Sequence, residues 1–271
     1  MNRILARPLR RILLGLGGVA LLPAVLATFS APARADLSLT GRSSVLAMGM
    51  QGVGQESLWL RKTKLRRDLI DRGKAYSHLY DLSTREITVI DHSLRQASVF
   101  TMSALNQDAD ARFSSRDLRL DLTPTGRRHQ LQSWNCAEHK IFAAMPAEVA
   151  GEKVSFEMTG TLWLARNAPE QGETAAFGRA AQEPDFFMGI PALAKKSPGQ
   201  AQGMSEIVRR LAPMGLLCAV DVETRYQGSG RMAELSRKMQ SRIAVTYEKY
   251  ATDPLKDDVF AIPPGYRVVR Q

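Results

Sequence analysis

The sequence predicts a mainly β fold, in which one curved antiparallel sheet forms a half-barrel and a few short helices cover its concave face. The main evidence is the stretch 154–165, where apolar residues alternate with polar ones as in a strand with one buried face. Similar short stretches recur along the chain between turn signals rich in Gly, Asp and Ser. A helical period is clear only at 204–211, so alternating β-α-β units are not expected.

The first 35 residues predict a cleavable signal peptide. An arginine-rich start precedes an apolar stretch at 12–29, and the small-x-small residues 33–35 suit cleavage before Asp36. Pro23 interrupts the apolar stretch, whereas a membrane-spanning helix needs about 20 apolar residues. The Arg10-Arg11 pair fits the twin-arginine route, and general secretion fits equally well. We therefore expect a periplasmic or exported protein with one domain over residues 36–271 and no membrane span after cleavage.

The charge of the chain depends strongly on this leader. The full sequence has a formal charge of +10, but the leader holds five basic residues and no acidic one. The remaining 32 basic and 27 acidic residues leave +5, a mild field that does not indicate a nucleic-acid partner. Basic residues cluster at 61–67, and on alternating strand positions such a run is typical of a solvated face.

Strand and turn signals organise the first half of the mature chain. Residues 36–49 predict a first strand, followed by a turn at 51–54. Further strands are expected at 57–64, 65–71, 76–81, 86–91 and 96–101, and a short helix at 103–113.

The second half adds more strands and the clearest helix. We expect strands at 118–122, 127–135, 136–144, 154–165 and 215–226, a turn at 124–126, a helix at 174–182, a loop at 183–196 and a helix at 204–211. After a turn at 227–230, one long strand is expected to place Leu235, Met239, Ile243, Val245 and Tyr247 on a single face.

Cys136 and Cys218 are the only cysteines, and an exported protein permits disulfides. A bond between them would close a loop of roughly 80 residues, worth about 4.5 kcal/mol in the chain-entropy model. The sequence leaves open whether they pair or remain two buried thiols.

Four motifs occur in a fixed order along the mature chain. They are Gly126 with Ser133-Trp134-Asn135-Cys136, then Gly160-Thr161-Leu162-Trp163-Leu164-Ala165, then Met214-Gly215-Leu216-Leu217, and finally Phe260-Ala261-Ile262-Pro263-Pro264-Gly265-Tyr266. The arrangement resembles an uncharacterised family of exported bacterial domains with a fold similar to the LolA/LolB lipoprotein carriers. The resemblance covers most of the mature chain and implies a LolA-like half-barrel. In the carriers, the concave face holds acyl chains.

No motif indicates an enzyme, a metal site or a cofactor. Cys136 and His139 have acceptable spacing for two metal ligands, with His129 as a third, but residues three apart on a strand point to opposite faces. The sequence contains no nucleophile elbow and no Gly-rich phosphate loop. We therefore expect a non-enzymatic protein with no metal and no cofactor.

Two functions remain open. The first is a carrier or sensor that binds a lipid or another hydrophobic ligand on the concave face. Its candidate ligand-binding residues are Phe156, Met158, Leu162, Phe187, Met188, Met204, Ile207, Leu211 and Met239. The second is an envelope protein–protein interaction module with a fully packed core, which docks a partner on the basic residues 61–67. An open apolar cavity would favour the first function and a filled one the second.

Overall fold

The computed structural model describes residues 36–47, 50–71, 73–110, 117–149, 151–166, 168, 171–183, 185–189, 191, 194, 198–238 and 241–271. The predicted signal peptide and Met239 lie outside these residues. None of the helices among them is both long and apolar enough to span a bilayer.

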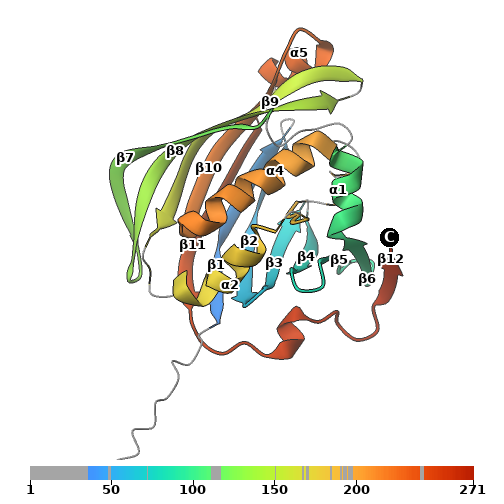
Figure 1. Ribbon diagram of the computed structural model, residues 1–271, viewed down its shortest axis with the longest axis vertical. Helices are drawn as coiled ribbons and strands as arrows, with labels where there is room; N and C mark the ends of the chain where they lie inside the picture. The colour runs from blue at the N-terminus through green and yellow to red at the C-terminus, as the bar shows by residue number, and fades with distance from the viewer. Residues whose placement is uncertain are drawn as a thin grey trace, which may run out of the picture. The chain divides into compact units, whose positions relative to one another are not determined.

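The described strands form one twelve-stranded sheet that curves strongly (Figure 1). Its order is β12-β6-β5-β4-β3-β2-β1-β11-β10-β9-β8-β7, and every pair is antiparallel except β12 with β6. The strands are β1(Leu37–Ala47), β2(Met50–Arg61), β3(Lys64–Asp71), β4(Lys74–Asp81), β5(Glu86–Asp91), β6(Gln96–Thr101), β7(Arg119–Leu131), β8(Trp134–Val149), β9(Glu152–Ala165), β10(Leu216–Gln227), β11(Ser241–Ala251) and β12(Arg267–Arg270). The predicted mainly β fold is confirmed.

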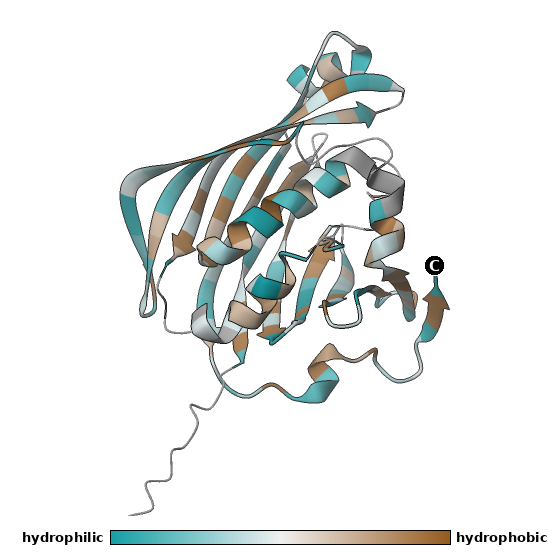
Figure 2. Ribbon diagram, viewed as in Figure 1, coloured by the Kyte–Doolittle hydropathy of each residue, from teal (hydrophilic) through white to brown (hydrophobic). Residues whose placement is uncertain are grey.

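Short helices cover the concave face of the sheet, as the sequence predicted. They are α1(Met102–Asp110), α2(Gln171–Ala180) and α4(Pro198–Leu211), and a further helix, α5(Arg231–Lys238), packs on β10 and β9 (Figure 1). Helix α4 packs on β8 and on α1, and α2 packs on β2. Apolar residues are distributed along the strands and on parts of these helices (Figure 2).

The alternating pattern of the central strand is confirmed in β9. Its apolar residues of one parity are all buried, and they are Val154, Phe156, Met158, Leu162 and Leu164. Gly160 has the same parity, but a side chain there would overlap the backbone of β10 at Asp221. The glycine therefore lets the two strands lie close together in the middle of the buried row.

The expected long strand after residue 230 is wrong in its first part. Residues 231–238 form α5, and the strand begins only at Ser241. The segment Arg231-Met-Ala-Glu-Leu-Ser-Arg-Lys contains good helix formers, and in so short a stretch a helical period is easily mistaken for an alternating one. Leu235 therefore lies on α5, while Ile243, Val245 and Tyr247 lie on β11 as expected.

Two expected turns are strand instead. Strand β2 continues through residues 51–54, paired with β1 as far as Met50 opposite Ala47. Strand β7 continues through residues 124–126, where its register against β8 shifts between Pro124 and Arg128. Pro124 is tolerated because β7 is the edge strand of the sheet, so it loses no ladder hydrogen bond on its outer side.

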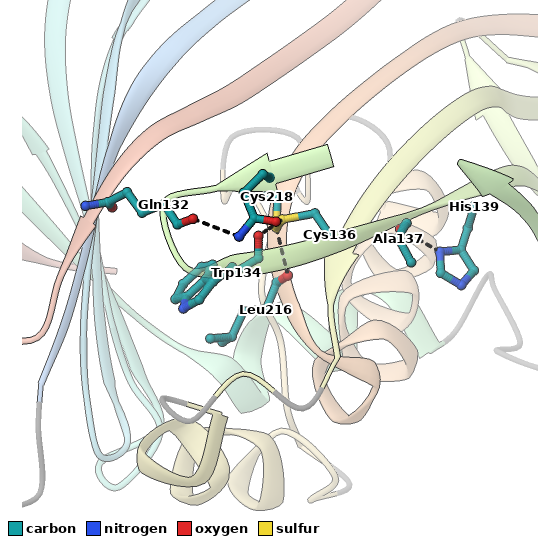
Figure 3. The surroundings of a disulfide bond; sticks show 8 residues. Gln132, Trp134, Cys136, Ala137, His139, Leu216 and Cys218 are labelled. Carbon is teal, nitrogen blue, oxygen red and sulfur yellow. Dashed lines mark hydrogen bonds between the residues drawn. A yellow bond between two sulfur atoms is a disulfide. The ribbon is translucent and has the colours of Figure 1, made fainter. Parts of the chain in front are cut away.

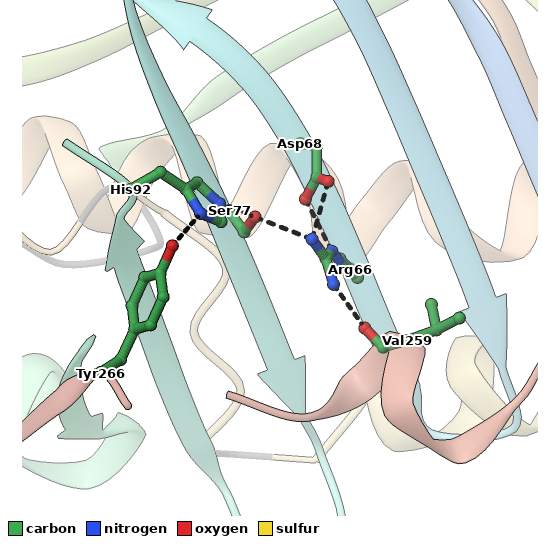
Figure 4. Close-up of polar contacts among 6 residues, drawn as sticks. All are labelled: Arg66, Asp68, Ser77, His92, Val259 and Tyr266. Atoms are coloured by element: carbon green, nitrogen blue, oxygen red, sulfur yellow. Dashed lines mark hydrogen bonds and ion pairs between the residues drawn. The ribbon is translucent and has the colours of Figure 1, made fainter. Parts of the chain in front are cut away.

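The prediction that residues 61–67 form a solvated face is wrong for all three arginines. Arg67 pairs with Glu56 on the concave face, whereas Arg61 and Arg66 lie under the C-terminal part of the chain. Residues 252–266, the C-terminal strap, run over them before β12 joins the edge of the sheet. Arg61 Nη1 donates a hydrogen bond to the Leu255 carbonyl at 3.0 Å, and Arg66 Nη1 donates one to the Val259 carbonyl at 2.9 Å (Figure 4). These side chains bind the chain's own backbone.

Candidate functional site: the concave face

An apolar patch occupies one half of the concave face. Its buried members are Leu118, Ile141, Ala143, Met145, Ala147, Val154, Phe156, Met158, Leu162, Leu164, Ile207 and Val222. Four of the predicted ligand-binding residues therefore meet here, and Met204 and Leu211 pack against the patch as partly buried neighbours. The patch combines β8, β9 and β10 with the inner side of α4.

The remaining predicted residues lie elsewhere. Phe187 is fully buried in the second large cluster, which takes residues from β1 to β5 and from β7 to β11, and Met188 packs against that cluster. Met239 is not described. The structure thus brings six of the nine predicted residues together and separates two from them.

Helix α4 is attached to its surroundings by hydrogen bonds and by close packing. Tyr226 of β10 donates a hydrogen bond to Gln200 at 3.0 Å, and the Met188 amide donates one to Ser205 Oγ at 2.9 Å. At Gly203 a Cβ atom would overlap the sulfur of Met145, so the helix lies directly on this β8 side chain. Side-chain hydrogen bonds and the close contact between Gly203 and Met145 therefore help to hold the helix on the sheet.

Two hollows on the described part of the chain differ greatly in size. An open groove of about 290 Å³ is lined by Asp117, Arg119, Ala144, Met145, Pro146, Val154 and Ser155. The second hollow is near α1 and α2 and measures about 10 Å³, room for one water molecule. Met145 and Val154 belong to the apolar patch, so the groove borders that patch, at a point where Val154 is 7% exposed and Met145 is fully buried.

A cluster of polar side chains, the polar centre, lies on the concave face of the other half. It consists of Glu56, Arg67, His78, Tyr80 and Tyr247, from β2, β3, β4 and β11. Arg67 donates through Nε to one oxygen of Glu56 at 2.9 Å and through Nη2 to the other at 2.8 Å. Tyr247 donates to the first of these oxygens at 2.8 Å. Strand pairing places His78 directly opposite Arg67.

Burial and the ion pair shift the pKa values in this centre. Burial, together with the Arg67 charge, lowers the pKa of His78 to about 4, so the imidazole is neutral at neutral pH. Burial raises the pKa of Tyr80 to about 12, and burial together with Glu56 raises that of Tyr247 further. Burial alone would lower the pKa of Arg67, but the Glu56 carboxylate raises it, so the guanidinium stays charged.

Arg67 differs from its neighbours in accessibility. Glu56 keeps 3% of its side-chain surface, whereas Arg67 keeps 36%. His78 and Tyr247 are 6% and 3% exposed. Part of the Arg67 side chain is therefore exposed to solvent, whereas the side chains around it are buried.

The polar centre was missed from the sequence, although a signal existed. Glu56 has the same strand parity as Leu58 and Leu60, and Arg67 the same as Leu65 and Leu69. A charged residue in an inward-facing row needs a buried partner. The partner could not be named because the pairing of β2 with β3, and the approach of β11, depend on the fold.

Cys136 and Cys218 are joined by a disulfide with a Cα–Cα distance of 6.4 Å (Figure 3). It links β8 and β10 next to the end of β9, where Ala165 pairs with both Cys136 and Leu216. The bonded Cys136 is therefore no thiolate ligand for a metal ion. Among the described residues, no group of three His, Cys, Asp or Glu side chains could hold one.

A Ser–His contact lies on the convex face beneath the strap. Ser77 Oγ is 2.7 Å from His92 Nε2, and His92 Nδ1 is 3.0 Å from the Tyr266 hydroxyl (Figure 4). Ser77 is fully buried and also accepts a hydrogen bond from Arg66. A substrate could not reach this hydroxyl, so the contact serves to hold the strap.

No protein-family model matches the sequence, and no curated protein matches it. The chain is similar to a solved structure provisionally described as an outer membrane lipoprotein-sorting protein domain from Vibrio parahaemolyticus, with 8% identity over 84% of this chain and 90% of that one and a TM-score of 0.33. It is also similar to a LolA superfamily protein from Nitrosomonas europaea, with 9% identity, the same coverage and a TM-score of 0.29. A structure of PNGF-II matches 87% of this chain at 10% identity with a TM-score of 0.34, and the chain spans 31% of that protein.

The first two structures are of the kind that the sequence motifs resemble. At these TM-scores the similarity carries no argument about what this chain binds.

Proposed function

We propose that this chain is an exported, non-enzymatic carrier or sensor that binds a lipid or another hydrophobic ligand on its concave face. The observation that carries the proposal is the groove of about 290 Å³, whose wall includes buried members of the apolar patch. A groove that borders an apolar patch suits an apolar ligand.

Met145 and α4 would control entry to the patch. Met145 lines the groove and contacts Gly203 of α4, so one flexible side chain separates solvent from the interior. A rotation of Met145 with a small lift of α4 would extend the groove between helix and sheet. In the state described here, helix and methionine fill that space.

The test measures binding of a fluorescent apolar probe to the purified protein, together with mass spectrometry of an organic extract. Ser155 lines the groove, so Ser155→Trp should block it and weaken probe binding at least tenfold. The matched control Val53→Trp adds the same side chain at a residue that is 67% exposed and should leave binding unchanged. A folded protein with neither bound lipid nor probe binding would contradict the proposal.

A second function is favoured by one observation. Most of the predicted ligand-binding residues are buried, and the small hollow near α1 and α2 has room for only one water molecule. A protein–protein interaction module with a packed core would show this. This second function predicts a well-folded protein that binds no probe but keeps an envelope partner bound. The paired variant Lys62→Glu with Lys64→Glu should release that partner. Arg61 and Arg66 are unsuitable for that test, because they hold the strap.

Removal of the leader belongs to the same proposal. If residues 1–35 are cleaved on export, the intact mass of the protein recovered from the envelope will correspond to a chain that begins at Asp36. A mass that includes the leader would contradict the export proposal.

A further inference from the structure

The polar centre is electrically balanced. Both oxygens of Glu56 are bound by Arg67, and one of them also accepts from Tyr247. The positive and negative charges lie within hydrogen-bonding distance, and the neighbouring His78 is neutral at neutral pH. A group that enters here meets hydrogen-bonding side chains with no net charge.

Arg67 still has hydrogen-bond donors to offer. Its contacts with Glu56 use Nε and Nη2, and within the described part of the chain Nη1 donates to no acceptor. About a third of the Arg67 side chain is exposed to solvent. A guanidinium nitrogen with two N–H groups suits a carbonyl or hydroxyl oxygen.

A single face of β11 connects this centre with the apolar patch. Tyr247, Val245 and Ile243 alternate along the strand; Tyr247 binds Glu56, and Ile243 packs against the patch. Four residues of strand span about 13 Å. A molecule with its head at Arg67 could therefore lay its tail over Val245 and Ile243.

We infer that the polar centre binds the uncharged, oxygen-bearing head of an amphiphile, such as a hydroxyl or an ester carbonyl, while the tail lies toward the apolar patch. This inference rests on the proposed function. A carboxylate head is disfavoured, because it would place a second negative charge beside Glu56 where little water is present to screen it.

The experiment compares three ligands of equal chain length as competitors of the apolar probe on the purified protein at pH 7.5, below micelle-forming concentrations. Oleyl alcohol has a hydroxyl head, oleate a carboxylate head, and 1-octadecene has none. Oleyl alcohol should displace the probe at least tenfold more strongly than octadecene, since a hydrogen bond to a charged group adds that much affinity. Oleate should be weaker than the alcohol.

Two variants test whether the charges of Glu56 and Arg67 cause the preference among the three competitors. Glu56→Gln keeps an oxygen acceptor for Arg67 and Tyr247 but leaves the site with a positive charge, so oleate should become the strongest competitor. The paired variant Glu56→Met with Arg67→Met removes both charges together and avoids an isolated buried one. In this variant, oleyl alcohol and octadecene should compete equally well with the bound probe.

The outcomes separate this inference from the proposed function. If no probe binds to the folded parent protein, the proposed function fails and the inference fails with it. If the probe binds but the three competitors are equal, the function stands and the ion pair only braces the sheet, which overturns the inference. Preference of the parent protein for oleate would overturn it as well.

Discussion

His78 is buried beside a permanent positive charge, and this has a consequence for stability. It lies on β4 opposite Arg67, is 6% exposed, and has a pKa lowered to about 4 by burial and by Arg67. In the unfolded chain the imidazole has a pKa near 6.5. Between these two values the unfolded state binds a proton that the folded state does not, so stability rises with pH in this range.

We expect the free energy of unfolding to fall as the pH drops from about 6.5 toward 4, with His78 accounting for about 3 kcal/mol at most. The measurement is urea unfolding at pH 7.5, 6 and 5 for the parent and for His78→Gln. Other titrating groups contribute to both proteins, so the difference isolates His78. If the free energies of unfolding of the two proteins change with pH in parallel, His78 does not titrate in this way.

The buried pair of Glu56 and Arg67 shows the limit of residue-level sequence interpretation. Parity alone places both side chains inward among leucines, and that much can be predicted. Their mutual contact and the bond from Tyr247, 191 residues away, depend on which strands become neighbours. A charged side chain that was assigned to a solvated face can therefore be placed in a buried ion pair only when the neighbouring strands are known.

At the level of elements, α4 was predicted as an amphipathic helix, and its close approach to β8 was not. The structure begins α4 at Pro198, six residues before the predicted start. Gly203 lies in this added part and contacts Met145, so a residue unfavourable for helices is used for packing.

Gly203→Ala should destabilise the protein by about 1–2 kcal/mol, because the new methyl group overlaps the Met145 side chain in a filled interior. Adding Met145→Val should recover part of the loss, which a double-mutant cycle of urea unfolding would measure. Gly178→Ala in α2 is the matched control, since a Cβ there meets only Ala212 O at 3.8 Å. That control should be neutral or stabilising by up to about 1 kcal/mol. Equal effects of the two alanines would refute the tight contact.

The C-terminal strap is an element that no local pattern indicated. Arg66 holds it through the Val259 carbonyl, and the Ser77–His92–Tyr266 contacts hold it a second time (Figure 4).

Arg66→Met should loosen the strap without unfolding the sheet. We expect amide hydrogen exchange in residues 256–270 to become about 10–100 times faster, as for the loss of a charged hydrogen bond. Arg42→Met is the control, because Arg42 pairs with Glu248 on an exposed surface. Unchanged exchange in the strap of Arg66→Met would mean that its other contacts hold it without Arg66.

For the whole molecule, the disulfide is the one covalent link between distant parts of the described chain. It joins residues 82 apart and ties β8 to β10 beside the end of β9. It also closes a loop that contains β9, α2 and α4, and hence most of the apolar patch.

Replacing both cysteines by serine should lower the free energy of unfolding by about 3–5 kcal/mol, because a loop of this length gains entropy in the unfolded chain. Urea unfolding of the parent with and without a reductant provides the comparison. The variant should not respond to reductant. A parent protein whose unfolding midpoint is equally insensitive to reductant would contradict a stabilising disulfide.

The sequence by itself determined the β architecture, the inward and outward parity of β9, and the helical face of α4. These are properties of neighbouring residues, which chain geometry translates directly into local structure. Tertiary structure alone decided that Arg61 and Arg66 face the strap, that the two cysteines meet, and that Glu56, Arg67 and Tyr247 form one centre. Each of these depends on contacts between distant parts of the chain, and such contacts are set by strand order and register, which local patterns do not encode.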